Sequence, residues 1–344
     1  QTVSGDPGLE IDKHQLPLPF WPFNHAPTQT LLTRHGIPFW NHLDARGIST
    51  KIYDIPSNYP PSESEHGHMC CLSGMGVPDL LGGYGTYQYF SSDTLRPSDD
   101  EGGMRRAIFF KNGVATIDIA GPENTMLKRP ARAEVKVEVR RHEARPEVRI
   151  DWQGQTVLLK EGEWSDWCNL DFELEMPAFL PNAHVSGICR FYVQQVRPEF
   201  KLYVTPINID PSDPGEQRIS EPPEFVTEIS DDLGLFYTAG FQEDHKARSN
   251  KVFDDEEYLA QARYVLKERR QLLDYALANY TDGLLFFYFS STDLQAHIFW
   301  WDGDDPHPLR TPEQASRYNK VIEDLYVEMD QIVGEVQARV GDAT

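Results

Sequence analysis

Asp293 and His297 are the residue pair in this sequence best suited to metal chemistry. They lie four residues apart, directly after the apolar run GLLFFYFSS at residues 283–291. A carboxylate oxygen and an imidazole nitrogen suit Zn²⁺, and the carboxylate alone suits harder cations. The spacing by itself is weak evidence, because about one chance match is expected in a chain this long. The competing interpretation is that Asp293 caps the following turn and His297 lies on the surface.

Two other segments contain residue types that bind metals or phosphates, and neither pattern is complete. The first is a set of potential zinc ligands: His66, His68, Cys70 and Cys71. It lies in a loop rich in Pro, Ser and Glu with no second ligand pair, so we favour an ordinary loop. The second is the glycine-rich segment 73–85, which lacks the G-x-x-x-x-G-K-[ST] pattern and contains Pro78, a residue without a backbone donor. We expect a loop near the pocket there.

The first hundred residues combine helical and strand patterns. Residues 37–46 predict a short helix that Gly47 ends. Residues 48–55, ISTKIYDI, predict a strand. A helix, a glycine and then a strand indicate an α/β fold.

The pattern changes near residue 104. From there to about residue 205, short segments alternate apolar and polar residues, and Asn-Gly and Gln-Gly pairs separate some of them. This pattern predicts antiparallel hairpins. We interpret residues 104–205 as a β-domain inserted into an α/β body. Residues 1–103, with a Pro-rich N-terminal segment, form the first part of that body, and residues 206–344 form the second.

Helix and strand patterns return after residue 206. Asp254 and Glu257 predict a capping pair at the start of a helix of about 25 residues. The continuous apolar run 283–291 predicts a strand buried on both faces, with a helix on each side in sequence. A last long helix begins at Thr311, its N-cap, and its core stripe comprises Ile322, Leu325, Met329, Ile332 and Val336.

The position of Asp293 and His297 after the apolar strand strengthens their case. In open α/β sheets, ligands bind outside the carboxyl ends of the strands. We therefore expect both side chains at the rim of the sheet, close enough together to share a metal ion.

The charge balance restricts the class of partner. The 344 residues include 32 Lys and Arg against 54 Asp and Glu, a net charge of −22. Such a field repels nucleic acid polymers and anionic membranes. A phosphate-handling site would need bound cations to reverse the local field. No apolar run is long enough to span a membrane.

The four cysteines leave the compartment open. They contain no C-x-x-C pair, and the N-terminus carries no signal-peptide pattern. Cys168 and Cys189 fall in one β-rich region, where they form either a disulfide or two buried thiols. An exported or periplasmic location is compatible with the sequence but not indicated by it.

Several segments of the chain resemble bacterial proteins of the type I phosphodiesterase/nucleotide pyrophosphatase branch of the alkaline phosphatase superfamily. They occur in order over roughly residues 30–335: PFWNHLDARGISTKIYDIPSNYPP, LSGMGVPDLLGGYGTYQYF, LLKEGEWSDW, GICRFYVQQVRPEFKLYVTPINIDP and GLLFFYFSSTDLQAHIFW. The resemblance implies an alkaline phosphatase-like doubly wound sheet with helices on both faces and an inserted antiparallel β-domain.

The resemblance also implies a role for Thr292, Asp293 and His297, which match the family's T-D-x-x-x-H motif. In that family the Asp and His of this motif bind one of two divalent metal ions, commonly zinc. The implied reaction is metal-dependent hydrolysis of phosphodiester or pyrophosphate bonds in a small-molecule substrate. One metal lowers the pKa of the nucleophile, and the other stabilises the leaving oxygen.

The sequence departs from the family pattern at both ends. In that family, the Thr or Ser nucleophile and the first metal-binding Asp lie in a part of the sequence that would come before Gln1. Its S-D-H-G type motif and last His ligand lie downstream, and no D-H-G occurs here. The pair Asp244–His245 lies in a polar loop and does not match. We therefore expect the chain to be a segment of such an enzyme, inactive alone, with no nucleophile assigned.

Two alternatives remain. Another activity of the superfamily (phosphomonoesterase, phosphonate hydrolase, sulfatase or phosphoglycerate mutase) would share the metal ligands. A non-catalytic binding module would carry its function in the β-domain and keep a vestigial metal site. Metal content separates these classes, because a binding module need not hold zinc through Asp293 and His297.

Overall fold

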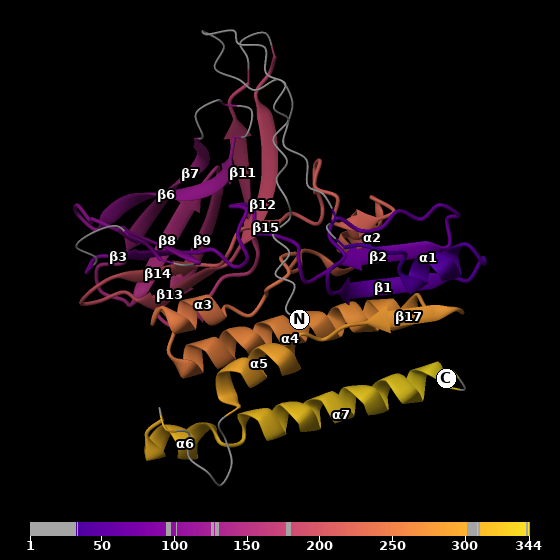
Figure 1. Cartoon of the computed structure of the whole chain (residues 1–344). Coiled ribbons are helices and arrows are strands. Elements are labelled where there is room, and N and C mark those ends of the chain that lie inside the picture. Colours follow the sequence, from indigo (N-terminus) through magenta and orange to yellow (C-terminus); the bar gives the residue numbers. More distant parts are fainter. Residues whose placement is uncertain are drawn as a thin grey trace.

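The computed structural model describes residues 32, 34–93, 98–100, 102–124, 127, 131–176, 180–300, 308, 310–341 and 343. These residues form a mixed α/β structure, which confirms the coarse fold class (Figure 1). The helices are α1 (Phe39–Asp44), α2 (Phe225–Leu233), α3 (His245–Ser249), α4 (Asp255–Ala278), α5 (Ser291–Phe299), α6 (Pro312–Tyr318) and α7 (Val321–Val340).

A four-stranded sheet carries the parallel strands of the fold's α/β part. Its strands, in spatial order, are β16 (Ser220–Glu221), β2 (Met69–Ser73), β1 (Thr50–Ile55) and β17 (Leu284–Phe287). Strand β1 pairs in parallel with both β2 and β17, and β16 pairs antiparallel with β2. The short helix and the following strand predicted before residue 60 are both confirmed.

Helices cover both faces of this sheet. Ile52 of β1 points to one face and belongs to the same buried cluster as Trp40 of α1. The next residue, Tyr53, points to the other face, as successive residues of a strand do. Its ring lies 5.8 Å from that of Phe225 in α2, and Leu272 of α4 belongs to the same cluster.

The strand before Asp293 is shorter and less buried than the sequence predicts. The apolar run 283–291 predicts a strand buried on both faces, but β17 ends at Phe287 and all of its residues are half-buried. Strand β17 is only half-buried because it lies at the edge of the four-stranded sheet. Strand β1 pairs along one side, and no strand among the described residues pairs along the other. Helices α4 and α5 flank β17 in sequence, as predicted.

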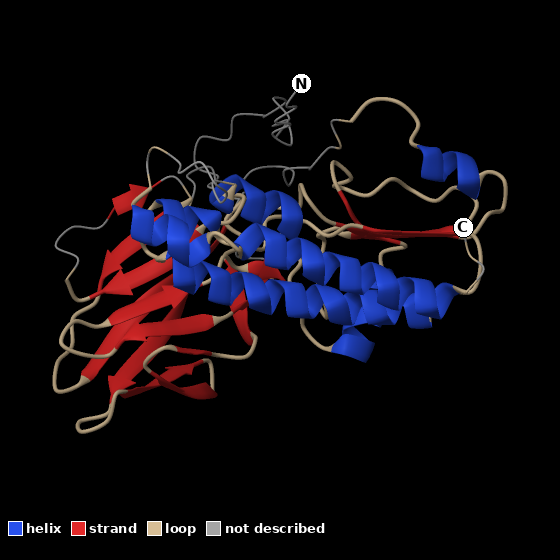
Figure 2. Ribbon diagram, turned by 90° about the horizontal axis from the view of Figure 1, so that it is seen from below, coloured by secondary structure: helices blue, strands red, loops and turns tan. Residues whose placement is uncertain are grey.

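The part of the chain between β2 and β16, called the strand-rich region below, contains most of the strands (Figures 1 and 2). Its strands are β3 (Tyr87–Ser91), β4 (Ser98–Asp100), β5 (Gly103–Ala107), β6 (Val114–Glu123), β7 (Arg132–Arg141), β8 (Glu147–Trp152), β9 (Gln155–Lys160), β10 (Glu163–Trp164), β11 (Cys168–Leu174), β12 (Ala183–Cys189), β13 (Phe191–Gln195), β14 (Lys201–Val204) and β15 (Asn208–Ile209). They form sheets in the orders β10-β13-β14-β3-β5-β4, β6-β7-β8-β9 and β11-β12-β15. Apart from the parallel β3–β5 pair, neighbouring strands here are antiparallel, as predicted.

Helices α4 and α7 run side by side below the strands in the view of Figure 1. The predicted capping pair Asp254–Glu257 opens α4, and Thr311 caps α6 as predicted. The expected single last helix is interrupted at residues 319–320, between α6 and α7. Neither residue is Pro or Gly, so no local helix breaker explains the interruption. No helix in the described ranges is long and apolar enough to cross a membrane.

The cysteines are free thiols. Cys168 and Cys189 are direct neighbours across the antiparallel β11–β12 pair, and both are buried. Burial raises the pKa of the Cys168 thiol to about 11. Of the two states that the sequence left open, the structure therefore has the buried thiols.

Candidate metal-binding site

The carboxyl ends of β1, β2 and β17 meet at one edge of the parallel sheet. After β17 the chain stays beside β1, because the Tyr288 N–H donates to the Tyr53 carbonyl oxygen at 3.2 Å. Helix α5 then begins, with Asp293 in its first turn and His297 in its last. Both candidate ligands therefore follow the carboxyl end of a parallel strand, where ligands bind in open α/β sheets.

Asp293 and His297 turn their polar atoms toward each other. His297 Nε2 lies 3.4 Å from Asp293 Oδ1, and the side chains are 76% and 51% exposed. Two ligand atoms of a tetrahedral zinc ion, each bonded at about 2.0–2.1 Å, are about 3.3–3.4 Å apart. The observed distance therefore fits two ligands of one ion. It also fits a contact between neighbouring turns of a helix that involves no metal, with His297 on the surface as in the competing interpretation. Asp293 lies in the first turn of α5.

His245 is the first residue of helix α3. Burial is the largest cause that lowers the pKa of His245, and the charge of His297 contributes in the same direction. The prediction that Asp244 and His245 lie in a polar loop is wrong, because Asp244 is the N-cap of α3 and His245 its first residue. Asp244 is 4% exposed and caps α3 by accepting a hydrogen bond from the Ala247 N–H at 2.9 Å. Its carboxylate also accepts from the Tyr203 hydroxyl in β14, so distant strands bury this segment.

A buried carboxylate, Glu243, connects α5 to α4. Its Oε2 accepts a hydrogen bond from the Tyr258 hydroxyl of α4 at 2.7 Å. Its Oε1 accepts one from Gln295 Nε2 at 3.4 Å, two residues after Asp293 in α5. Burial raises the pKa of Glu243 to about 7. Glu243 thus supports the helix that carries the candidate ligands, although nothing in the local sequence distinguishes it from a surface acid.

A buried ion pair lies at the carboxyl end of β1. Asp54 pairs with Arg269 of α4, and Arg269 Nε donates to Gln242 Oε1 at 2.9 Å. Burial lowers the pKa of Arg269 to about 9. Gly74 packs directly on the Asp54 backbone, since a Cβ at residue 74 would lie 2.4 Å from Asp54 Cα. Because Gln242 precedes Glu243, this pair links the edge of the sheet to the segment that supports α5.

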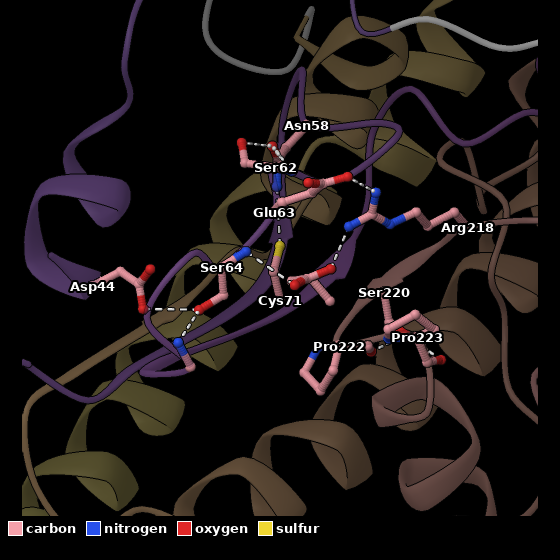
Figure 3. A network of polar contacts seen from close by, with 12 residues as sticks. Asp44, Asn58, Ser62, Glu63, Ser64, Cys71, Arg218, Ser220, Pro222 and Pro223 are labelled. Atoms are coloured by element: carbon pink, nitrogen blue, oxygen red, sulfur yellow. Dashed lines mark hydrogen bonds and ion pairs between the residues drawn. The ribbon is translucent and has the colours of Figure 1, made fainter.

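The possible zinc ligands His66 and His68 before β2 and Cys70 and Cys71 within it are not brought together. The Asp44 carboxylate accepts hydrogen bonds from the backbone N–H groups of His66 and His68, at 3.0 and 2.8 Å. Figure 3 shows Asp44 and Cys71 in the polar network around this loop. Cys70 and Cys71 are consecutive strand residues, so their side chains point to opposite faces of the sheet. The loop also precedes β2 and therefore lies at the amino end of that strand, opposite the carboxyl edge.

The glycine-rich segment 73–85 uses its backbone donors internally. The buried Asp79 carboxylate accepts hydrogen bonds of 2.6–3.1 Å from the N–H groups of Leu81, Gly83, Gly85 and Thr86. These donors are thus occupied by a side chain of the same loop. The expectation that this segment is a loop is confirmed, and the anion that these backbone donors bind is the Asp79 carboxylate.

Within the described residues, the candidate site consists of two side chains, those of Asp293 and His297. Among the described residues, no three or more His, Cys, Asp or Glu side chains are grouped so that they could hold a metal ion. Two protein ligands leave a zinc ion under-coordinated, since stable sites supply three or four. In comparisons with known proteins, no family model, no curated protein and no solved structure matches this chain.

Proposed function

We propose that this chain contributes Asp293 and His297 as two ligands of a divalent cation in a metal-dependent phosphoester hydrolase. Zinc is the cation that a carboxylate and an imidazole suit best. The reaction class is hydrolysis of phosphodiester or pyrophosphate bonds, as in the type I phosphodiesterase/nucleotide pyrophosphatase proteins that the sequence resembles. The observation that carries the proposal is the 3.4 Å distance between the two ligand atoms. The pair lies just after the carboxyl end of the parallel strand β17, where the apolar run in the sequence predicts it.

The same proposal extends to the fold. Strands β1, β2 and β17 are parallel, and helices cover both faces of their sheet. Both features are compatible with an alkaline phosphatase-like doubly wound sheet. Residues 104–205, which supply most strands of the neighbouring strand-rich region, would then be the inserted β-domain, with β3, β4 and β15 joining its sheets from outside those bounds.

The chemistry of the two side chains fits a cation that handles phosphate. Asp293 supplies negative charge, and His297 supplies a neutral nitrogen when it is deprotonated. Both are exposed, so water or a phosphoryl oxygen can complete the shell. A zinc ion bound there would polarise a phosphoryl oxygen and lower the pKa of a bound water. It would also reverse the local field in a chain with a net charge of −22, which otherwise repels phosphate esters.

Calorimetric titration of the metal-free chain with Zn²⁺ tests the proposal. We expect weak binding of one ion, and a loss of affinity of at least about tenfold in Asp293→Ala and in His297→Ala, since each variant removes one of two protein ligands. The chain offers a matched control. Asp171 and His184 form another exposed pair, 3.0 Å apart across β11 and β12.

The control variant His184→Ala should bind zinc as the wild type does. An equal loss in His184→Ala would show that exposed Asp–His pairs bind the ion indiscriminately, and undiminished binding in Asp293→Ala would remove the assigned site. Turnover of bis-p-nitrophenyl phosphate with added Zn²⁺ is a second readout. Turnover that disappears in Asp293→Ala would show that the chain also contains a nucleophile.

A further inference from the structure

A basic pocket lies at one end of the strand-rich region, where three turns meet. Its volume is about 570 Å³. The residues that line it, called the basic pocket below, are Asn112, Gly113, Val114, Arg140, Arg141, His142, Glu143 and Arg197. Pockets that bind small molecules are typically of this size, about 300–1,000 Å³.

Local turn chemistry forms the pocket walls. Asn112 and Gly113 have φ values of 52° and 77°, the positive angles that a two-residue hairpin turn requires. The Arg141 N–H donates to the Gly113 carbonyl oxygen at 2.9 Å, which fixes the turn beside β7. Arg197, in the turn between β13 and β14, donates through Nη2 to the carbonyl oxygens of His142 and Glu143 at 2.7 and 2.9 Å. Three segments distant in sequence are therefore held around one cavity.

Two of the arginines in the pocket have no carboxylate partner in the part of the chain that the structure describes. Arg140 pairs with Glu138 at 2.6 Å. Arg141 instead stacks on the Phe110 ring, 3.9 Å from its centre, and neither Arg141 nor Arg197 forms an ion pair within the described residues. Arg141 and Arg197 line the same pocket, where burial lowers the pKa of Arg141 and the like charge of Arg197 lowers it further.

This local charge contrasts with the rest of the chain. Three arginines line the pocket against one carboxylate, that of Glu143, whereas the chain as a whole has a net charge of −22. Adjacent guanidinium groups repel each other until an anion neutralises them. Their planar donor forks match the oxygens of phosphate, which can bind two arginines at once.

We propose that the basic pocket binds a small molecule that carries a phosphate group. The volume exceeds what free phosphate needs, so the ligand extends beyond the phosphate itself. Arg141 and Arg197 bind the phosphate oxygens, and Arg140 lies beside them with its charge shared with Glu138. The pocket shares no residue with the Asp293–His297 pair, so this inference does not depend on the proposed cation site.

Calorimetric titration of the full chain with pyrophosphate, at constant ionic strength and with a chelator present to remove metal ions, tests the proposal. We expect saturable binding that weakens at least about tenfold in Arg141→Gln and in Arg197→Gln, since each loses charge-assisted hydrogen bonds. Arg141→Lys keeps the charge without the planar fork and should fall between the wild type and Arg141→Gln.

Arg149→Gln is the matched control. Arg149 is an exposed arginine on β8, pairs with Asp151 at 2.8 Å and does not line the pocket. It should bind pyrophosphate as the wild type does, and circular dichroism should confirm that every variant is folded. The proposal is overturned if the wild type does not bind, or if Arg149→Gln weakens binding as much as Arg141→Gln. Tighter binding of a tricarboxylate than of pyrophosphate would overturn the assignment to phosphate.

Discussion

Replacing Glu243 with Gln should change how folding stability depends on pH. Burial raises the pKa of Glu243 from its ordinary value of 4.5 to about 7, although the Tyr258 hydroxyl donates to the carboxylate. The folded state therefore binds the proton more tightly than the unfolded state does. In the wild type, the contribution of Glu243 to the unfolding free energy is fully present below pH 4.5 and is lost as the pH rises through about 7. The amide of Glu243→Gln stays neutral, so the variant avoids this loss.

The size of the effect follows from the two pKa values. With 4.5 in the unfolded state and about 7 in the folded state, the loss between about pH 5.5 and pH 8 is roughly 2 kcal/mol. The unfolding free energy of Glu243→Gln should rise relative to the wild type by that amount over the interval. Asp244, whose pKa burial raises to about 6, titrates in both proteins and cancels in the difference. The lower pH stays above the isoelectric point of about 4.8.

Urea unfolding followed by tryptophan fluorescence at the two pH values measures this difference. Glu216→Gln, which changes an exposed glutamate in the same way, controls for the loss of one charge. A stability difference between Glu243→Gln and the wild type that is the same at both pH values would refute the reasoning. It would mean that Glu243 is ionised in the folded state throughout and that its hydrogen bonds outweigh its burial.

Three other outcomes are expected. Arg269→Met should lower the unfolding free energy by about 3–5 kcal/mol in urea titrations, because Asp54 stays buried without its partner. Adding Asp54→Asn should restore part of the loss, and no recovery would mean that the pair is not the cause. Gly74→Ala should cost about 2 kcal/mol or more, since its Cβ would lie 2.4 Å from the Asp54 backbone; an unchanged urea midpoint would contradict this close contact. Thiol titration in denaturant without reductant should count four thiols, and a count of two would mean that Cys168 and Cys189 are paired.

Sequence patterns predicted the features that depend on neighbouring residues alone. The capping pair Asp254–Glu257 and the N-cap Thr311 are local interactions of a few residues, and both are present. The alternating segments after residue 104 form antiparallel strands because a period of two places apolar residues on one face. The contact between Asp293 and His297 is likewise local, since residues four apart meet on a helix.

Features set by distant elements could not be predicted in this way. The exposure of β17 depends on which strands lie beside it, and an apolar run does not specify its neighbours. Glu243 and Asp244 belong to a segment that is polar in sequence. They are buried because Tyr258 and Tyr203, from a helix and a strand elsewhere in the chain, pack against them. The hydrogen bonds to Asp79 could not be predicted either, because they depend on the path that its loop follows.

Nuclear magnetic resonance of the histidine side chains tests the claim that Asp293 and His297 share a divalent cation. The chain contains 11 histidines, whose ring nitrogens can be followed during a zinc titration. The Nε2 resonance of His297 should move to the range of a metal-bound nitrogen, Asp293→Ala should abolish this change, and His184 should be unaffected. A zinc titration that leaves His297 Nε2 unchanged, or that shifts it equally in Asp293→Ala, would contradict the claim.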